Sequence, residues 1–199
     1  MSIKINFKNT SIKNPSKNLV LFTDEKFNIN LFKKILSNSE FFYINDLLKT
    51  SDLKKNCLIF DLNSKKKIVL VSLKKNIKIS DLENLGAEFY GCINYGKNNE
   101  YNLNADSITH KNKIFLGHFL HGLKLKSYEF NKYKSKKDSR LITINVFGNK
   151  NKYFNNNFLK FKALEEGTFY TRDLVSEPGN ILHPDEYAKR LKSLTKHGL

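Results

Sequence analysis

The sequence predicts an α/β fold in which a mixed β-sheet is flanked by helices and followed by further helices towards the C-terminus. Short apolar runs rich in β-branched residues indicate strands, and stretches with apolar residues every three or four positions indicate amphipathic helices. The two kinds of segment alternate along the 199 residues. Because sheets and helices each bury an apolar face, such a chain packs its helices against a central sheet.

The first half of the chain contains four predicted strands. Residues 2–7 alternate between apolar and polar side chains, which is typical of a half-buried strand, and residues 19–22 form a second, shorter apolar run. The runs 57–60 and 68–73 are continuous, as in interior strands buried on both faces, and the short polar stretch between them predicts a hairpin. We expect antiparallel edges at the N-terminal strand and at this pair, and therefore a mixed sheet.

Three helices are expected before residue 130. Apolar residues at helical spacing predict one over residues 27–36 and another over about 82–93. The second follows Ser-Asp-Leu-Glu at residues 80–83, which matches a capping box. Gly86 should let that helix approach the sheet closely. A third helix is expected over about 113–129, with its apolar residues on one face.

The rest of the chain is predicted as one strand followed by two helices. Residues 141–147 are rich in β-branched side chains and indicate a strand, whereas residues 150–157 have the composition of a loop. A long helix is expected over about 158–176, ending before a Pro-Gly pair. Pro184 is placed for the first turn of the last helix, and Gly198 for its left-handed C-terminal cap.

The net charge of +16 is unevenly distributed. Residues 111–162 contain 12 Lys and one Arg against two acidic residues, whereas residues 163–199 are close to neutral, which indicates a boundary near residue 163. Only three of the 35 basic residues are Arg, and an excess of Lys and Asn is what AT-rich codons produce. Because specific nucleic-acid recognition relies on the bidentate Arg side chain, we expect only weak, nonspecific attraction to nucleic acid.

Several classes of protein are excluded by what the sequence lacks. No apolar run approaches the roughly 18 residues of a membrane-spanning helix, so no membrane association is expected. The N-terminus has no apolar segment typical of a secretory signal, which favours a cytoplasmic location. Cys57 and Cys92 lie 35 positions apart and form neither a disulfide framework nor a metal knuckle. We expect two reduced, partly buried thiols.

The residues alone predict no catalytic and no metal-binding site. His118 and His121 share a helix, with His110 upstream, but His121 points nearly opposite the apolar face, so we expect an exposed structural pair. Adjacent acidic residues do not face one another on a helix and are expected to be solvent-facing or at helix starts. They are Asp24–Glu25, Glu165–Glu166 and Asp185–Glu186. The Lys-rich run at 132–137 is expected to be a solvated loop.

Residues 166–184 have the sequence Glu-Gly-Thr-Phe-Tyr-Thr-Arg-Asp-Leu-Val-Ser-Glu-Pro-Gly-Asn-Ile-Leu-His-Pro. This segment resembles the leucyl aminopeptidase (cytosol aminopeptidase) family. The family pattern is a helix with Gly, then Ala-Arg-Asp-Leu-Val-Asn, a Pro, an Asn and a second Pro that opens the next helix. Thr171 and Ser176 replace the usual Ala and Asn. The resemblance implies that the residues matching this pattern form a structural signature between two domains. They are Gly167, Arg172, Asp173, Leu174, Val175, Pro178, Asn180 and Pro184.

Two earlier segments support the resemblance. Residues 119–137 are similar to the family's GLLLGAYRFDKYKSK region, and residues 68–75 to its VLLVGLGK strand, where Ser72 and Lys74 replace both glycines. The resemblance implies a macro-domain-like, three-layer α/β domain over residues 1–155, without catalytic residues. Residues 156–199 would then be a connecting helix and the first helix of a truncated catalytic domain.

The family's catalytic domain carries two divalent metals, zinc or manganese, and the motif NTDAEGR, and neither the motif nor any metal ligand has a matching position in this chain. The resemblance therefore implies a parent enzyme that removes N-terminal residues from peptides by metal-activated water, and a chain that is inactive and metal-free by itself. Its expected partner is the missing catalytic domain, with a hexamer implied for the full-length protein. The alternative is a stand-alone basic α/β module that binds nucleic acid or another polyanion, which the salt dependence of binding would distinguish.

Overall fold

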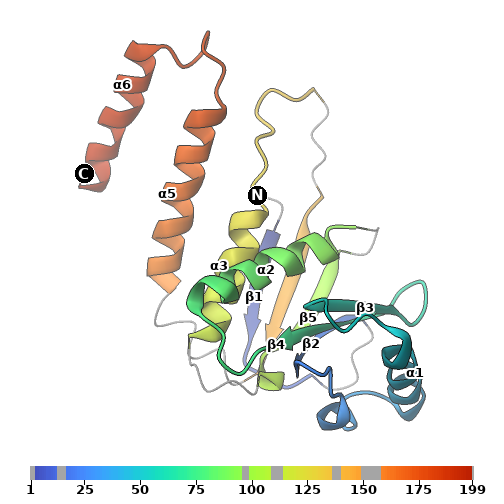
Figure 1. Cartoon of the computed structure of the whole chain (residues 1–199). Coiled ribbons are helices and arrows are strands. Elements are labelled where there is room, and N and C mark those ends of the chain that lie inside the picture. The colour runs from blue at the N-terminus through green and yellow to red at the C-terminus, as the bar shows by residue number, and fades with distance from the viewer. Residues whose placement is uncertain are drawn as a thin grey trace.

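The computed structural model describes residues 3–12, 17–95, 99–108, 114–135, 140–148 and 158–198. Its centre is a six-stranded sheet with the strand order β1-β6-β5-β2-β4-β3 (Figure 1). Every described pairing is parallel except that of β3 with β4, so the sheet is mixed, as predicted. The strands are β1 (Ile3–Lys8), β2 (Asn18–Asp24), β3 (Cys57–Asp61), β4 (Lys67–Leu73), β5 (Glu100–Asn104) and β6 (Ile142–Phe147).

The two edges of the sheet differ from the prediction in different ways. The β3–β4 hairpin is antiparallel, as expected. However, β1 pairs with β6 in parallel, with Ile3 opposite Ile142, so the prediction of an antiparallel N-terminal edge is wrong. The pattern within a strand does not reveal which distant strand it joins. The prediction of β3 as an interior strand is also wrong, because β3 is an edge strand. Its continuous apolar run reflects burial of both faces by helices rather than a neighbour on each side.

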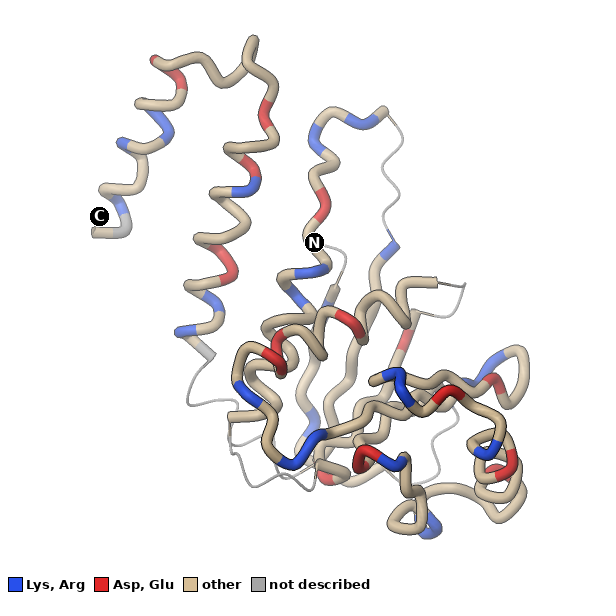
Figure 2. The backbone as a smooth tube through the Cα atoms, viewed as in Figure 1, with Lys and Arg blue, Asp and Glu red and all other residues tan. Residues whose placement is uncertain are grey.

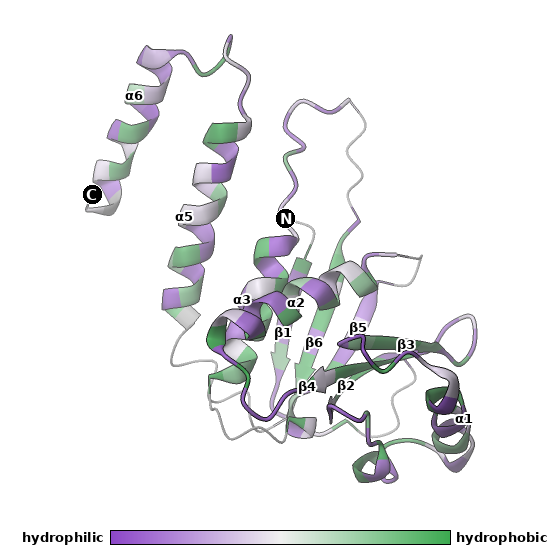
Figure 3. Cartoon of the chain, viewed as in Figure 1, coloured by the Kyte–Doolittle hydropathy of each residue, from purple (hydrophilic) through white to green (hydrophobic). Residues whose placement is uncertain are grey.

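Helices cover both faces of the sheet and complete three layers (Figures 1 and 3). On one face, α2 (Ile79–Ile93) and α3 (Phe115–Lys126) bury a core with the inward side chains of all six strands. On the other face, a second core lies between β2, β3 and β4 and the helix α1 (Asn38–Thr50), which follows the short 3-10 turn η1 (Asn30–Phe32). The predicted α/β fold class is confirmed.

The predicted helix over residues 27–36 is wrong. That segment contains only the turn η1, and Phe27, Phe32 and Leu36 enter the second core from irregular backbone. Their spacing reflects burial without the hydrogen bonding of an α-helix. The helix lies further on, in α1, where the Ser37 hydroxyl accepts from the Glu40 amide at 3.3 Å and the Glu40 carboxylate accepts from the Ser37 amide at 3.0 Å. The capping box of this part of the chain is therefore here.

The start and the packing of α2 also differ from the prediction. The helix begins at Ile79, and its N-cap, Lys78, makes no side-chain cap, so the capping box at residues 80–83 is wrong. Gly86 approaches α3 rather than the sheet, since a Cβ atom there would lie 1.9 Å from the Phe119 carbonyl oxygen. A Cβ at Gly122 would lie equally close to the Glu83 carbonyl oxygen. The two glycines thus allow the backbones of α2 and α3 to touch.

The C-terminal part follows its prediction closely. The helices α5 (Phe158–Ser176) and α6 (Pro184–Lys192) run antiparallel and extend beyond the sheet (Figure 1). The 3-10 turn η4 (Ser193–His197) follows α6, and Gly198 adopts the expected left-handed conformation with φ 80°. The predicted loop 150–157 and His110 lie outside the described residues. In the described part of the chain, no helix combines the length and apolarity needed to cross a membrane.

Candidate functional site

The family signature lies on α5 and on the turn that leads to α6, where α5 meets the C-terminal end of α3. Arg172 Nη1 donates to the Leu125 carbonyl oxygen at 2.5 Å, and the guanidinium lies 5.5 Å from the centroid of the Tyr128 ring. The last carbonyl groups of a helix have no intrahelical donors, and a cation there also complements the helix dipole. Arg172 therefore caps α3 and holds α5 against it.

Asp173 makes the next contact of this junction. The Tyr128 hydroxyl donates to Asp173 Oδ1 at 2.7 Å, and the Tyr128 ring stacks on Phe169 with 5.6 Å between the ring centroids. Burial and the hydrogen bond to the Asp173 carboxylate raise the pKa of Tyr128 above its usual range. The phenol stays protonated at neutral pH and acts as a donor that links the residues after α3 to α5.

Glu177 joins three segments at the end of α5. Its side chain is 1% exposed, and it accepts hydrogen bonds from Lys132 Nζ and the Tyr133 hydroxyl, both in the segment after α3. Arg190 Nη1 on α6 donates to the same carboxylate at 3.0 Å. The hydrogen bonds from Lys132, Tyr133 and Arg190 lower the pKa of Glu177 to about 2, against the opposing effect of burial. We call the contacts of Arg172, Asp173 and Glu177 the junction network.

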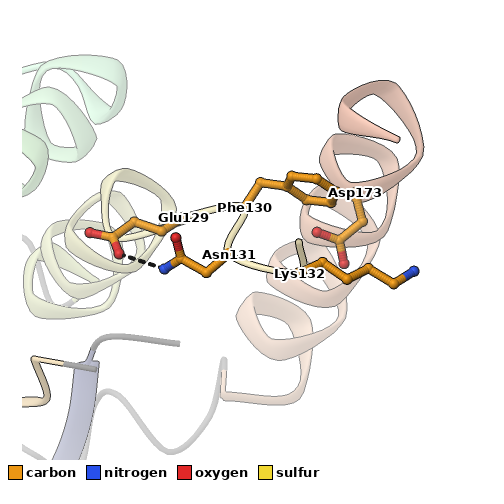
Figure 4. Close-up of a pocket in the computed structure, with 5 residues that line it drawn as sticks. All are labelled: Glu129, Phe130, Asn131, Lys132 and Asp173. Atoms are coloured by element: carbon orange, nitrogen blue, oxygen red, sulfur yellow. Dashed lines mark hydrogen bonds between the residues drawn. The ribbon is translucent and has the colours of Figure 1, made fainter. Parts of the chain in front are cut away.

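Two hollows lie along this junction. The smaller, of about 280 Å³, lies between the segment after α3 and α5 (Figure 4). The larger, of about 430 Å³, lies where α2, α3 and α5 meet, and Arg172 and Tyr128 line it. Asp173 and Lys132, at the smaller hollow, and Arg172, at the larger, are engaged in the junction network. Both hollows therefore follow the seam along which α5 docks. The smaller is lined by Glu129, Phe130, Asn131, Lys132 and Asp173.

The remaining signature residues shape the turn or face outward. The Pro178 carbonyl oxygen accepts from the amides of Ile181 at 2.9 Å and Leu182 at 3.0 Å, and Pro184 occupies the first turn of α6. Leu174 is buried, whereas Val175 is 81% exposed. Asn180 is exposed, and a Cβ atom at Gly167 would meet nothing within 4 Å. The signature thus contains residues that the described chain uses and residues that it leaves uncovered.

The prediction that His118 and His121 form an exposed pair is wrong. His121 is 6% exposed and its Nδ1 lies 3.2 Å from Glu165 Oε1 on α5, while His118 Nδ1 lies 2.8 Å from Glu83 Oε1 on α2. The Phe161 ring lies against both imidazoles, with centroid distances of 4.9 and 5.1 Å. The helical pattern of α3 shows one apolar face, and only the tertiary structure shows that α5 covers a second face.

Glu165, predicted to face solvent, is likewise buried. Its carboxylate lies between His121 and Lys124, whose Nζ donates to Oε2 at 2.7 Å. Glu166, its neighbour, is exposed as expected, and Asp185 and Glu186 lie in the first turn of α6. The buried Glu165 thus belongs to the contact between α3 and α5, which extends the junction network along the helix.

The described residues do not fit the two-metal centre of the family that the chain resembles. No three His, Cys, Asp or Glu side chains come together there in a way that could hold a metal ion. The two imidazoles are each paired with a different carboxylate, and those carboxylates come from different helices. A di-metal site needs several ligands that converge on one point. We assign no catalytic step to this part of the chain.

Comparison with known proteins supports an aminopeptidase relationship. No family model matches the chain. It is 40% identical over 78 residues to a probable cytosol aminopeptidase of Dinoroseobacter shibae and 36% identical over 85 residues to one of Wolbachia pipientis wMel. These matches cover 39% and 40% of this chain but only 16% and 17% of the relatives. The chain thus matches a small part of proteins that are much longer.

Solved structures share the fold over nearly the whole chain. A tomato leucine aminopeptidase variant superposes with a TM-score of 0.71 at 19% identity, covering 98% of this chain and 42% of that one. The bottromycin maturation enzyme BotP, in complex with Mn, superposes with a TM-score of 0.61 at 14% identity and covers 92% of this chain. The resemblance to leucyl aminopeptidases that the signature predicted is confirmed, in sequence by the cytosol aminopeptidases and in fold by these structures.

Proposed function

We propose that this chain is the N-terminal, non-catalytic part of a metal-dependent leucyl aminopeptidase, and that it docks onto a catalytic half that removes N-terminal residues from peptides. The junction network carries this proposal. Signature residues Arg172 and Asp173 anchor α5 to the α/β domain, and Glu177, which lies within the same segment, anchors both α5 and α6. In this interpretation, the signature sets the position at which the catalytic half starts. We keep the domain boundary at 155/156, just before α5.

Exposed apolar side chains on α5 and α6 support a partner at this end of the molecule. Leu159 is 79% exposed and Val175 81%, and three further large side chains on these helices are more than a third exposed. Exposed apolar groups on adjoining elements are typical of an interaction surface. Leu164 and Val175 lie about three helical turns apart and share one face of α5, whereas Leu159 lies on another face. We propose that the catalytic half covers the face of α5 with Leu164 and Val175 and reaches the exposed side chains of α6, Tyr187 and Leu191.

The cofactor, assembly and location of the whole protein follow from the same proposal. The two divalent metals, zinc or manganese, would be held by the catalytic half, where they would activate water for attack on the peptide bond. The Mn complex of the similar BotP structure supports a divalent metal. We propose a hexamer for the full-length protein and, from the names of the curated relatives, a cytoplasmic location.

A complementation experiment tests this proposal. The purified chain is mixed with a separately produced catalytic half of a cytosol aminopeptidase, and association is measured by size-exclusion chromatography and hydrolysis by release of p-nitroaniline from leucine p-nitroanilide. We expect association and no hydrolysis by the chain alone with zinc or manganese supplied. Metal-dependent turnover by the chain alone, or a failure of the two halves to associate, would contradict the proposal.

A matched pair of variants locates the docking surface. Val175→Gln changes an exposed side chain on α5, and Leu31→Gln changes a comparably exposed side chain, 71% exposed, on the turn η1. Loss of one apolar contact at a well-packed interface costs about 1.4 kcal/mol of binding free energy, which weakens binding tenfold. We expect Val175→Gln to weaken association by that amount and Leu31→Gln to leave it unchanged. If Leu31→Gln weakened association more than Val175→Gln, the partner would lie against the turn η1 rather than against α5.

The charge of the chain favours a second candidate, a basic module that binds nucleic acid or another polyanion. The net charge is +16, but among the residues that the structure describes, Lys and Arg are distributed over many elements and are interspersed with Asp and Glu (Figure 2). A dispersed positive charge supports weak, sequence-independent attraction that salt screens. Binding of a labelled DNA duplex should therefore disappear as salt approaches physiological concentration. Nanomolar, sequence-selective binding at that salt would favour this candidate over the first.

A further inference from the structure

The two cysteines, 35 positions apart in the sequence, meet at one edge of the sheet. Cys57 is the first residue of β3 and belongs to the core beneath α2, and Cys92, in the last turn of α2, packs against the same core. Both are free thiols, α2 packs on β3, and the two side chains lie close enough for each to affect the pKa of the other. The sequence spacing predicts no such pair, because a strand and a helix from different parts of the fold bring it together.

Hydrogen bonds of the residue before Cys57 fix the start of β3 relative to α2 and β4. Asn56 Nδ2 donates to Glu88 Oε2 at 2.8 Å, and the Asn56 carbonyl oxygen accepts from the Ser72 amide at 2.8 Å. Asn56 precedes Cys57, and Glu88 lies four residues, about one helical turn, before Cys92. The start of β3 is therefore fastened both to α2 and to β4, which keeps Cys57 near the turn of α2 that precedes Cys92.

The two thiols differ in exposure and in acidity. Cys57 is buried, whereas Cys92 is half-buried and reachable from solvent. The hydrogen bond from Cys57 lowers the pKa of Cys92 to about 7, with a smaller contribution from Lys55, while that hydrogen bond and burial raise the pKa of Cys57. A lowered pKa increases the share of Cys92 that is thiolate, the form that reacts with oxidants and electrophiles.

We propose that Cys57 and Cys92 form a reversible intramolecular disulfide when the protein meets hydrogen peroxide. The Cys92 sulfur attacks one peroxide oxygen and breaks the O–O bond, which yields a sulfenic acid on Cys92 and releases hydroxide. The Cys57 sulfur then attacks the Cys92 sulfur and displaces its hydroxyl group. The thiol proton of Cys57 and one further proton convert the two leaving hydroxides into water. Two thiols are oxidised to one disulfide, and one peroxide is reduced to two waters.

This disulfide would join the edge strand β3 to the helix α2, which packs on α3 through Gly86. A cross-link between positions 57 and 92 restricts the unfolded chain, so the oxidised protein should resist heat more than the reduced protein. Thiol reagents such as dithiothreitol reverse the bond by exchange. The pair is thus a modification site within the α/β domain, separate from the junction network and independent of the proposed function.

Peroxide oxidation followed by alkylation and peptide mapping tests the proposal. The reduced chain is treated with hydrogen peroxide, unfolded in iodoacetamide and digested. We expect a peptide pair linked through Cys57 and Cys92, a mass loss of about 2 Da in the intact chain, and a higher melting temperature that dithiothreitol reverses. Recovery of both cysteines as alkylated thiols, oxidation of Cys92 to sulfinic acid without a link, or a disulfide between two chains would overturn the proposal.

Two variants separate the roles of the thiols. In Cys57→Ser, which keeps a hydroxyl that can donate to Cys92, Cys92 should form a sulfenic acid that dimedone traps, whereas in Cys92→Ala the buried Cys57 should stay reduced. Trapping on the residue at position 57 rather than on Cys92 would reverse the assigned roles and overturn the mechanism. If Cys57→Ser does not fold, the wild-type chain still tests the mechanism, because the alkylation rate of Cys92 should rise with pH through a midpoint of about 7. A midpoint at the ordinary thiol value would overturn the assignment.

Discussion

The α/β domain and the α5–α6 hairpin are held together by different interactions. Strands and helices on both sides of the sheet bury two continuous apolar cores. By contrast, α6 has no buried residue, and among the α5 side chains that the structure describes, the large apolar ones that are buried are Phe161 and Leu174. The hairpin docks mainly through the junction network and the Glu165 contacts, and Figure 3 shows mixed hydropathy along both of its helices.

This difference indicates that the two regions serve different purposes. Burial of apolar surface stabilises a domain by itself, at about 25 cal/mol per Å², whereas ion pairs and hydrogen bonds fix orientation with a modest net gain. The α/β domain therefore has the interactions of a self-sufficient unit. The hairpin has those of a connector whose outer face is available to another unit. The four predictions below distinguish the stability of the α/β domain from the docking of the hairpin.

The largest effect is expected from Gly122→Val in the α/β domain. A Cβ atom there would lie 1.9 Å from the Glu83 carbonyl oxygen, and the backbone of α2 cannot yield without losing its packing on α3. We expect a loss of about 3 kcal/mol or more in the free energy of unfolding, measured in urea. The control is Gly91→Ala, where a Cβ meets nothing within 4 Å and better helix propensity should stabilise slightly. Equal stability of Gly122→Val and wild type would show that α2 and α3 do not touch.

A smaller and local effect is expected from Phe161→Ala on α5. The ring lies against His118 and His121 and within 2.6 Å of a Cβ built at Gly117, so its removal empties the contact between α3 and α5. A Phe→Ala change in a well-packed core costs about 3–5 kcal/mol, but this loss should fall on docking of the hairpin, and the free energy of unfolding of the α/β domain should change less than in Gly122→Val. Here we expect the loss to appear as undocking of the hairpin. Amide hydrogen exchange should accelerate in α5 and α6 while β4 and β6 keep their protection. Acceleration throughout the sheet would mean that the two regions unfold as one unit.

The third prediction concerns the pH dependence of docking through Glu177. Its pKa is lowered from 4.5 to about 2 when α5 and α6 are docked, so the undocked state binds a proton more readily as the pH falls. The stabilisation is complete above about pH 4.5 and is lost as the pH falls through about 2. Amide exchange of α6 should therefore accelerate over this range, and Glu177→Gln should abolish the dependence. An unchanged pH profile in Glu177→Gln would assign it to other carboxylates.

The smallest effect is expected from Val175→Gln in the isolated chain. Val175 is 81% exposed and lies in the last turns of α5. Substitutions at exposed positions that touch no special feature change stability by about 0.5 kcal/mol or less. We therefore expect an unchanged melting temperature, although the same variant should weaken the proposed docking of the catalytic half. A large loss of stability would show that this side chain packs within the chain.

Local sequence signals predicted well where the C-terminal helices begin and end. Pro184 opens α6 and Gly198 closes the segment with positive φ, because both residues act through their own backbone geometry. The pairing partners and the second burial face were less predictable. β5 went unrecognised because its Asn residues disfavour strands, although Tyr101 and Leu103 enter the core. His121 and Glu165 were predicted to be exposed, because the cover that α5 supplies comes from 44 residues further along the chain.

The sequence by itself determined the α/β class, the β3–β4 hairpin and most helices, because apolar periodicity depends on neighbouring residues. It also determined the resemblance to leucyl aminopeptidases through the signature around Arg172 and Asp173. Only the tertiary structure decided what those residues contact, which edge each strand occupies and that Cys57 meets Cys92. The physical reason is that these contacts join segments distant in sequence, whose spacing along the chain carries no record of their distance in space.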